Sequence, residues 1–353
     1  LVVCLICSFI VCFSFRVIGA MGLLSAYLFI AVNSTWLWIL VLVVALYWVY
    51  MRVFIANYDT NIERTDGKTF IITGAETGIG RMTADLMASR GGHLIMACND
   101  VHLGQIARDQ IVARTNNKQV EVRHLDLSSL DSVRKFSKDF HDSVGKLDVL
   151  INNAAIACSP NPTTADGLNT IMQVNHFGPF LLTNLLLDLL KKSSPSRVVF
   201  VSSLFHHFHK FSMDNLNCDK QQLPNCRVYF NSKLANILTA KYFARMLQGT
   251  GVTVNTVHPG MALTDMTKKC SGSFIGILCN LWLNVFGKTP SEAAMTPAYA
   301  ATEIKLAYVT GEHFADCKVS HCVANIAHNT NLQDKLFEKS AELVHLKSAE
   351  KHF

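Results

Sequence analysis

The sequence predicts an α/β fold: one domain with a doubly wound parallel sheet, preceded by a hydrophobic membrane anchor. Two observations predict the sheet. Short β-rich runs alternate with helical stretches through residues 57–353, and these runs are apolar on both faces. Parallel strands covered by helices on both sides have this composition. A third observation, a long uncharged stretch at the amino end, predicts the anchor.

The amino-terminal stretch contains very little charge. Arg16 is the only charged residue before Arg52, so an apolar span of about 20 residues fits here. The run is too long for a cleaved signal peptide and lacks a clear small-residue cleavage site. We therefore expect residues 1–56 to form an uncleaved transmembrane anchor. Because Met21 offers an alternative natural start, residues 1–20 would then lie upstream of the natural protein.

The composition argues against several classes of partner. Charged residues make up 16% of the chain and apolar residues 50%. The net charge of +6 is spread along the chain, which suits an anionic membrane surface and does not indicate nucleic acid. Apart from three in the apolar leader, the cysteines are scattered without zinc spacing. We expect neither a disulfide framework nor a metal site.

The predicted strands follow one another with helices between them. They are residues 68–74, 93–98, 120–127, 147–154, 197–203 and 252–260. After the first strand a helix is expected to about residue 90, and after the second another near 102–114. This alternation predicts right-handed crossovers. No second boundary or repeat is evident, so residues 57–353 are predicted to form one domain.

The first turn, Thr73–Gly80, reads TGAETGIG and joins a predicted strand to a predicted helix. Glycines let the backbone approach a pyrophosphate, and the start of the helix offers unpaired N–H groups and positive potential. The turn therefore indicates a phosphate-binding loop, with a ligand-free glycine turn as the alternative. A carboxylate at Glu76 would repel phosphate if it pointed inward, so we expect it to point to solvent.

Tyr229 and Lys233 lie four positions apart in VYFNSKLAN, where a helix is expected. That spacing places both side chains on one face. An ammonium group beside a phenol favours the phenolate and lowers the pKa of the phenol, which would suit acid–base chemistry. Because the pattern is common by chance, the pair alone also fits an amphipathic tyrosine beside a solvated lysine. Whether the pair is catalytic therefore depends on the other motifs of the chain.

Taken together and in order, the motifs resemble those of the short-chain dehydrogenases/reductases. The family pattern T-G-x-x-x-G-x-G matches the glycine turn, and N-N-A-G matches residues 152–155 with alanine in the last position. The family's P-G turn beside the nicotinamide matches Pro259-Gly260. The resemblance runs from about residue 66 to the end of the sixth strand. It implies a Rossmann domain and an NAD(P)-dependent oxidoreductase acting on CH–OH groups.

The resemblance implies four catalytic residues: Asn175, Ser203, Tyr229 and Lys233. Tyr229 would be the acid–base group, while Lys233 would assist it and hold the nicotinamide ribose. Ser203 would hydrogen-bond to the substrate oxygen, and Asn175 would take part in a water relay to Lys233. No metal is required. The implied cofactor contacts are Gly74, Thr77, Gly78, Ile79, Gly80, Asn99, Asp126, Asn152, Ala154, Tyr229, Lys233, Pro259, Gly260 and Thr264.

Cofactor choice depends on the end of the second strand. An acidic residue there would bind the ribose 2′-hydroxyl and repel a 2′-phosphate. The retinol dehydrogenase-like branch of the family usually has arginine at the position of Asn99. The usual side-chain partner of the 2′-phosphate is therefore missing here. Cys98 occupies the position where NAD-preferring relatives have aspartate. Its side chain is uncharged there and would not repel a 2′-phosphate. We expect NADP(H) to be favoured, with NAD(H) as the alternative.

Several features resemble the microsomal retinol dehydrogenase-like branch, among them the anchor and the segments VSSLFHH and VHPG. This resemblance implies an endoplasmic reticulum membrane enzyme with a lipophilic substrate, most of all retinol and retinal. A polyprenol, a steroid or another lipid carbonyl is the alternative substrate. A catalytically silent nucleotide-binding scaffold is the alternative of another class, and the four intact residues argue against it.

The apolar stretch 270–287 fits a lipid tunnel or membrane contact as well as a core helix. The oligomeric state is left open.

Overall fold

The computed structural model describes residues 35, 38–39, 41–47, 49, 63–219, 223–262 and 287–352. The chain divides into two compact units, Leu1–Asn57 and Tyr58–Phe353. In the first unit, the described residues 41–47 are helical. No helix within the described ranges has both the length and the hydropathy that a membrane span needs. Most of the predicted anchor, 1–56, and nearly all of the apolar stretch 270–287 lie outside the described residues.

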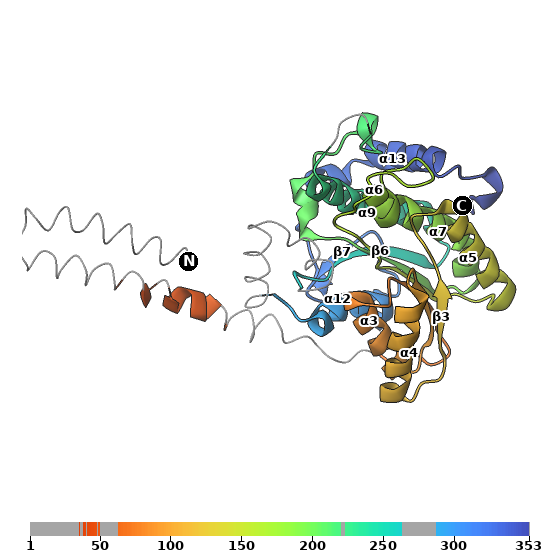
Figure 1. Ribbon diagram of the computed structural model, residues 1–353, viewed down its shortest axis with the longest axis horizontal. Coiled ribbons are helices and arrows are strands. Elements are labelled where there is room, and N and C mark those ends of the chain that lie inside the picture. Colours follow the sequence, from red (N-terminus) through yellow and green to blue (C-terminus); the bar gives the residue numbers. More distant parts are fainter. Residues whose placement is uncertain are drawn as a thin grey trace, which may run out of the picture. The chain divides into compact units, whose positions relative to one another are not determined.

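A twisted sheet runs through the second unit (Figure 1). Its order is β3-β2-β1-β4-β5-β6-β7-β8, and all neighbours are parallel except β7 and β8. The strands are β1 (Thr69–Thr73), β2 (His93–Cys98), β3 (Val120–His124), β4 (Val149–Asn152), β5 (Ser196–Val201), β6 (Val252–His258), β7 (His313–Ala315) and β8 (Lys318–Val319). The predicted doubly wound parallel sheet is confirmed. The order reverses between β1 and β4, and ligands bind at such switch points.

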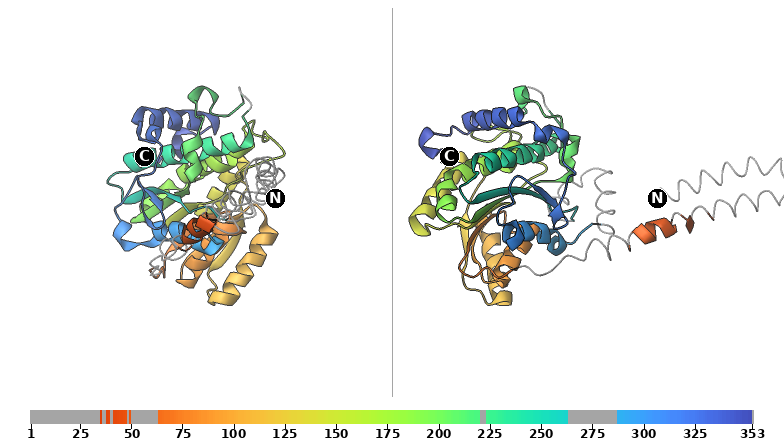
Figure 2. Two further views of the ribbon diagram at one scale, coloured as in Figure 1. Left: turned by 90° about the vertical axis from the view of Figure 1, so that its left-hand side faces the viewer. Right: turned by 180° about the vertical axis from the view of Figure 1, so that it is seen from behind.

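Two layers of helices cover the sheet (Figures 1 and 2). On one face lie α3 (Gly78–Ser89), α4 (Val101–Thr115) and α12 (Pro290–Thr302). On the other lie α5 (Leu130–Ser143), α6 (Thr170–Met172), α7 (Gly178–Leu185), α8 (Leu187–Lys192), α9 (Asn225–Met246) and α13 (Thr330–Leu343). Each layer has its own apolar core. Strands such as TFIIT are buried on both faces for this reason.

The helix starts follow ordinary capping chemistry. The Asp100 side chain accepts from the Leu103 N–H at the start of α4, and Ser129 caps α5 in the same way. At the start of α12, Thr289 and Glu292 form a reciprocal capping box. These caps determine the residue at which each helix begins. The residues before that point form the loops at the carboxyl edge of the sheet.

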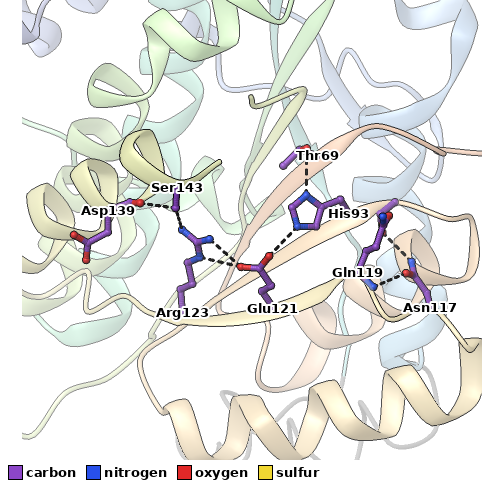
Figure 3. A network of polar contacts seen from close by, with 9 residues as sticks. Thr69, His93, Asn117, Gln119, Glu121, Arg123, Asp139 and Ser143 are labelled. Carbon is purple, nitrogen blue, oxygen red and sulfur yellow. Dashed lines mark hydrogen bonds and ion pairs between the residues drawn. The ribbon is translucent and has the colours of Figure 1, made fainter. Parts of the chain in front are cut away.

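A polar network closes the opposite, amino-terminal edge at β2 and β3 (Figure 3). The His93 ring lies 3.1 Å from the Glu121 carboxylate, and Arg123 donates to the same carboxylate at 2.8 Å. Arg123 also donates to Ser143 at the end of α5. Because β3 is an edge strand with an exposed face, it carries polar residues where the inner strands carry apolar ones. This network ties the edge strand β3 to its neighbour β2 and to the end of α5.

Candidate active site

The glycine turn lies at the carboxyl end of β1 and is held from the end of β4. Thr73 Oγ1 accepts from the backbone N–H groups of Asn153 and Ala154, both at 3.0 Å. The Asn153 amide donates to the Thr73 carbonyl at 3.0 Å. Sequence reasoning assigned no role to Asn153, although its place in the N-N-A motif was the available signal. The two loops at the switch point thus form one hydrogen-bonded unit.

Close backbone packing explains the glycines of this turn. Gly74 has a φ of +65°, and a Cβ atom there would lie 2.9 Å from Ala154 Cα. A Cβ atom on Gly80 would lie 2.1 Å from the Gly74 carbonyl oxygen. Gly78, at φ +56°, begins α3. The glycines therefore allow the close backbone packing of this turn and leave its backbone open to a dinucleotide pyrophosphate at the start of α3.

Gly74→Ala is expected to distort this turn, because the added methyl group meets Ala154 and the φ angle is unfavourable for alanine. Gly249→Ala is the matched control: its φ is +80°, but a Cβ there has no neighbour within 4 Å. The control should lose only the backbone-strain term, about 1 kcal/mol of unfolding free energy. Gly74→Ala should lose more stability and weaken NADH binding at least about tenfold. Equal behaviour of the two variants in thermal unfolding and NADH titration would contradict this account of the turn.

Tyr229 and Lys233 lie on α9, both at least nine-tenths buried. The Lys233 ammonium is 5.5 Å from the centre of the Tyr229 ring. It donates to the Val201 carbonyl at the end of β5 at 2.9 Å, and the Ser202 hydroxyl donates to the Lys233 carbonyl at 2.9 Å. These two bonds fasten α9 to the carboxyl end of β5. Burial lowers the pKa of Lys233 to about 7, so a group placed here can exchange its proton near neutral pH.

Ser203 follows β5 by two residues and is 8% exposed. Its hydroxyl accepts a long, 3.4 Å hydrogen bond from the Phe205 N–H at the start of a short 3₁₀ turn, Leu204–Phe208. Its carbonyl accepts from the His206 ring at 2.6 Å, and His206 Nε2 accepts from the Ala324 N–H. His206 therefore braces the turn that carries Ser203. Among the described His, Cys, Asp and Glu side chains, no three come together in a way that could hold a metal.

Asn175 lies in a π-helical turn, Gln173–Phe177, between α6 and α7. Its side chain bonds to the backbone of Ile156 through both Oδ1 (2.8 Å) and Nδ2 (2.9 Å). Nδ2 also donates to the Ser232 hydroxyl on α9 at 3.0 Å. π-Helical turns are often found at functional sites. Asn175 thereby joins the loop after β4 to the helix that carries Tyr229.

Sequence reasoning missed the residues that hold this π-helical turn. The Asn236 amide donates to the Asn175 carbonyl at 2.8 Å and its oxygen lies 3.2 Å from His176 Nδ1. His176 Nε2 lies 3.0 Å from the Ser340 hydroxyl on α13. Burial lowers the pKa of His176 to about 4, so the ring is neutral at pH 7. The π-helical turn is therefore held by α9, which bonds to the Asn175 carbonyl, and by α13, which contacts the His176 ring.

The remaining predicted contacts line the same edge of the sheet. Asn152 donates to Thr183, while its Oδ1 is buried without a hydrogen-bond partner among the described residues. Asp126 follows β3 and accepts from the N–H and hydroxyl of Ser128. The Pro259 carbonyl accepts from the Lys288 ammonium, which also pairs with Asp316. Thr77 and Ile79 belong to the glycine turn. Thr264 lies outside the described residues.

One expectation about this loop is wrong. Glu76 does not point to solvent: its side chain is half-buried, and its carboxylate oxygen Oε2 is buried without a hydrogen-bond partner among the described residues. Burial raises the pKa of Glu76. The loop turns inward at this position because Gly74 and Gly78 both have positive φ angles, which the sequence pattern did not reveal. Asn99 itself is exposed at the end of β2.

A nicotinamide dinucleotide fits these residues. The glycine turn offers bare backbone and a helix start for the pyrophosphate, and buried polar oxygens of Glu76 and Asn152 lack partners in the described chain. A buried lysine, a serine and a tyrosine lie around the ends of β5 and α9. The arrangement can therefore hold a dinucleotide at the switch point and place a proton-exchanging group beyond the end of β5.

Comparisons with known proteins agree with this geometry. The family profile described as short chain dehydrogenase matches residues 68–272. The chain is 43% identical over 282 residues to retinol dehydrogenase 11 of Mus musculus, covering 79% of this chain and 87% of that protein. It is 42% identical over 287 residues to retinol dehydrogenase 12 of Homo sapiens, covering 81% and 88%.

Solved structures share the fold. An uncharacterized protein from Mycobacterium paratuberculosis is similar with a TM-score of 0.65 and 30% identity, covering 82% of this chain and 97% of that one. L-Sorbose reductase from Gluconobacter frateurii, solved with NADPH and L-sorbose, has a TM-score of 0.58 and 18% identity, covering 71% and 95%. At that identity the likeness concerns the fold alone.

The chain belongs to the short-chain dehydrogenase/reductase family. Within that family it is a member of the retinol dehydrogenase-like branch, as the identities of about 40% over most of its length show. It is therefore an oxidoreductase that acts on CH–OH groups.

Proposed function

We propose that the protein interconverts a lipophilic alcohol and its aldehyde or ketone, with retinol and retinal as the first candidates. The observation that carries the chemistry is the buried Tyr229–Lys233 pair at the carboxyl end of β5. The candidate substrate comes from the retinol dehydrogenases that the chain is similar to. A bound nicotinamide dinucleotide would accept or supply the hydride.

In this proposal, Tyr229 exchanges the proton of the substrate hydroxyl. The protonated Lys233 lies beside the phenol ring and favours the phenolate, which makes Tyr229 a competent base in oxidation and acid in reduction. Ser203 donates a hydrogen bond to the substrate oxygen and stabilises the charge that develops there. Asn175 fixes the loop after β4 against α9, and so determines the spacing between the cofactor edge and Tyr229.

Apolar surface beside Tyr229 supports a lipophilic substrate. Phe230 packs against Tyr229 at 6.3 Å between ring centres, and Phe205 stacks on Phe230 at 5.3 Å. Phe208 extends this cluster and is 57% exposed. Burial of such surface by a polyene or other hydrocarbon chain is favourable at roughly 25 cal/mol per Å².

The experiment that tests this function is a turnover screen with membranes from cells expressing the full chain. The panel contains retinol and retinal, a polyprenol, a steroid alcohol and a short polar alcohol, each with both nicotinamide cofactors. Turnover of retinoids above all others supports the proposal. Preference for the polyprenol or the steroid would support the proposed reaction but assign it to a different substrate. Absence of turnover with every lipid would contradict the proposed function.

We further propose that residues 1–56 anchor the enzyme, in the endoplasmic reticulum membrane. The support is the nearly uncharged sequence up to Arg52. A chain lacking residues 1–56 is expected to appear in the soluble fraction of a high-salt extract, with the full chain as the control in the pellet. If the shortened chain stays with the membranes, the apolar stretch 270–287 would be the next candidate for membrane contact.

A further inference from the structure

The turn Pro259-Gly260, at the end of β6, lies beside the turn that carries Ser203. Strands β5 and β6 pair in parallel up to their carboxyl ends, and the Leu204 N–H donates to His258 Nδ1 at 3.3 Å. Burial lowers the pKa of His258 to about 4, so its ring is neutral at pH 7 and accepts this bond. Because ligands of open parallel sheets bind outside the carboxyl ends of the strands, the turn borders the place where a nicotinamide would meet its substrate.

Lys288 holds this turn from a distant part of the chain. Its ammonium donates to the Pro259 carbonyl at 3.3 Å, and its stem lies along Gly260, where an added Cβ atom would be 2.5 Å from Lys288 Cδ. The Lys288 N–H donates to the Met261 carbonyl at 2.8 Å, and Lys288 pairs with Ala262 in a parallel β-bridge. Residues 259–262 are therefore fixed by one lysine, through its backbone and its side chain together.

Lys288 is in turn held from two sides. The next residue, Thr289, begins the capping box of α12, which fixes the backbone. The ammonium forms an ion pair with Asp316, and only 14% of the Lys288 side chain is exposed.

Asp316 owes its position to a tight hairpin. Asp316 and Cys317 form the turn between β7 and β8, and their φ angles are +51° and +56°. Two positive φ angles in succession are what the common two-residue hairpin turn requires. The hairpin therefore places the carboxylate that orients the Lys288 ammonium.

We infer that Lys288 is a positioning residue for hydride transfer: oriented by Asp316, it fixes the Pro259-Gly260 turn against which the nicotinamide and the substrate are aligned. The inference rests on the proposed function, since it places a nicotinamide dinucleotide at this edge of the sheet. In this role Lys288 exchanges no proton and acts through the turn. A misplacement of about 1 Å between reacting groups can lower a rate about 100-fold, so loss of the ammonium should slow the reaction more than it weakens binding.

The test compares Lys288→Met, Lys288→Arg and Lys318→Met in the purified full chain in detergent. Methionine keeps an apolar stem along Gly260 and removes the ammonium, whereas arginine restores a charged donor. Lys318, exposed on β8 of the same hairpin, is the matched control. The turnover of the best substrate of the lipid screen is divided by the number of sites that bind the preferred nicotinamide cofactor, so that misfolded protein is not counted.

Lys288→Met should lower turnover per binding site at least about tenfold, while KM for the lipid and the dissociation constant of the cofactor stay within about threefold of the wild-type values. Lys288→Arg should be at least about threefold faster than Lys288→Met, because the charged donor returns. Lys318→Met should match the wild-type protein. The fluorescence emission of the bound reduced cofactor should change in Lys288→Met alone, since it reports the surroundings of the nicotinamide.

Asp316→Asn is a second variant, and it keeps the inference testable if Lys288→Met does not fold. Asparagine tolerates a positive φ, so the hairpin should persist while the charge that orients the ammonium is lost. Turnover per binding site should fall at least about threefold, because a charge-assisted contact is replaced by a weaker one. Turnover equal to that of the wild-type protein would overturn the inference.

A role of Lys288 confined to folding would lower Tm and the number of binding sites in Lys288→Met and leave turnover per site unchanged. That result, or equal losses in Lys288→Met and Lys288→Arg, would overturn the inference and leave the proposed function intact. A wild-type protein that binds cofactor and turns over no lipid would contradict the proposed function. The cofactor emission then decides the inference, which an unchanged emission in Lys288→Met would overturn. Failure of the wild-type protein to bind either nicotinamide dinucleotide would overturn both.

Discussion

Replacement of Tyr229 by phenylalanine is expected to lower turnover by about 10²–10⁴-fold, the usual contribution of an acid–base group. The ring stays packed against Phe230, so the fold and the cofactor site should persist. The measurement is kcat for the best substrate of the lipid screen, together with the dissociation constant of NADH. We expect the first to fall and the second to change less than about threefold, because the phenol hydroxyl contributes mainly to proton transfer.

Tyr242→Phe provides the control on the same helix. Tyr242 stacks on Phe337 of α13 at 4.2 Å, and it should keep that contact without its hydroxyl. Its turnover should remain within about threefold of the wild-type value. A Tyr229→Phe enzyme that retains more than about a tenth of the wild-type rate would show that another group exchanges the proton.

Lys233→Met is expected to abolish turnover to a similar extent and to change how stability depends on pH. In the unfolded chain Lys233 has the ordinary lysine pKa of 10.5, and burial lowers it to about 7 in the folded protein. Between these values the unfolded chain binds more protons, so the Lys233 contribution makes the free energy of unfolding rise with pH. Below about pH 7 the buried charge destabilises the cofactor-free fold by up to about 5 kcal/mol.

The variant should therefore be more stable than the wild-type protein at pH 7, and this advantage should shrink as the pH rises toward 10.5. The measurement is chemical unfolding of the cofactor-free proteins across that range. Lys241→Met, on the same helix with a half-buried ammonium bonded to Gly311, is the control and should keep its turnover. A Lys233→Met stability difference that does not vary with pH would show that Lys233 is not held as a buried charge.

The strands, and the motifs at their carboxyl ends, could be predicted from the sequence. Strands such as β1 and β5 consist of apolar runs that only a sheet covered on both sides can bury. Glycines and a Tyr-x-x-x-Lys pair mark the loops because backbone approach and helix spacing are local properties. The short strands β7 and β8 were missed, since three and two residues carry no periodic signal.

Features that depend on contacts distant in sequence could not be predicted. The π-helical turn at Asn175 is held by Asn236 and by the bond between His176 and Ser340, which lie 164 positions apart. The direction of Glu76 depends on the backbone angles of two glycines. Both concern the geometry of the site, and neither leaves a pattern in the sequence.

The central claim is that this chain moves hydride between a nicotinamide and a lipid carbonyl with Tyr229 as the proton donor. Reduction of retinal by membranes containing the full chain, supplied with NADH and NADPH deuterated at the transferring position, tests it most directly. We predict retinol that carries one deuterium at the alcohol carbon with wild-type membranes, and none above background with Tyr229→Phe membranes. Retinol without deuterium, or equal labelling by the two membrane preparations, would contradict the claim.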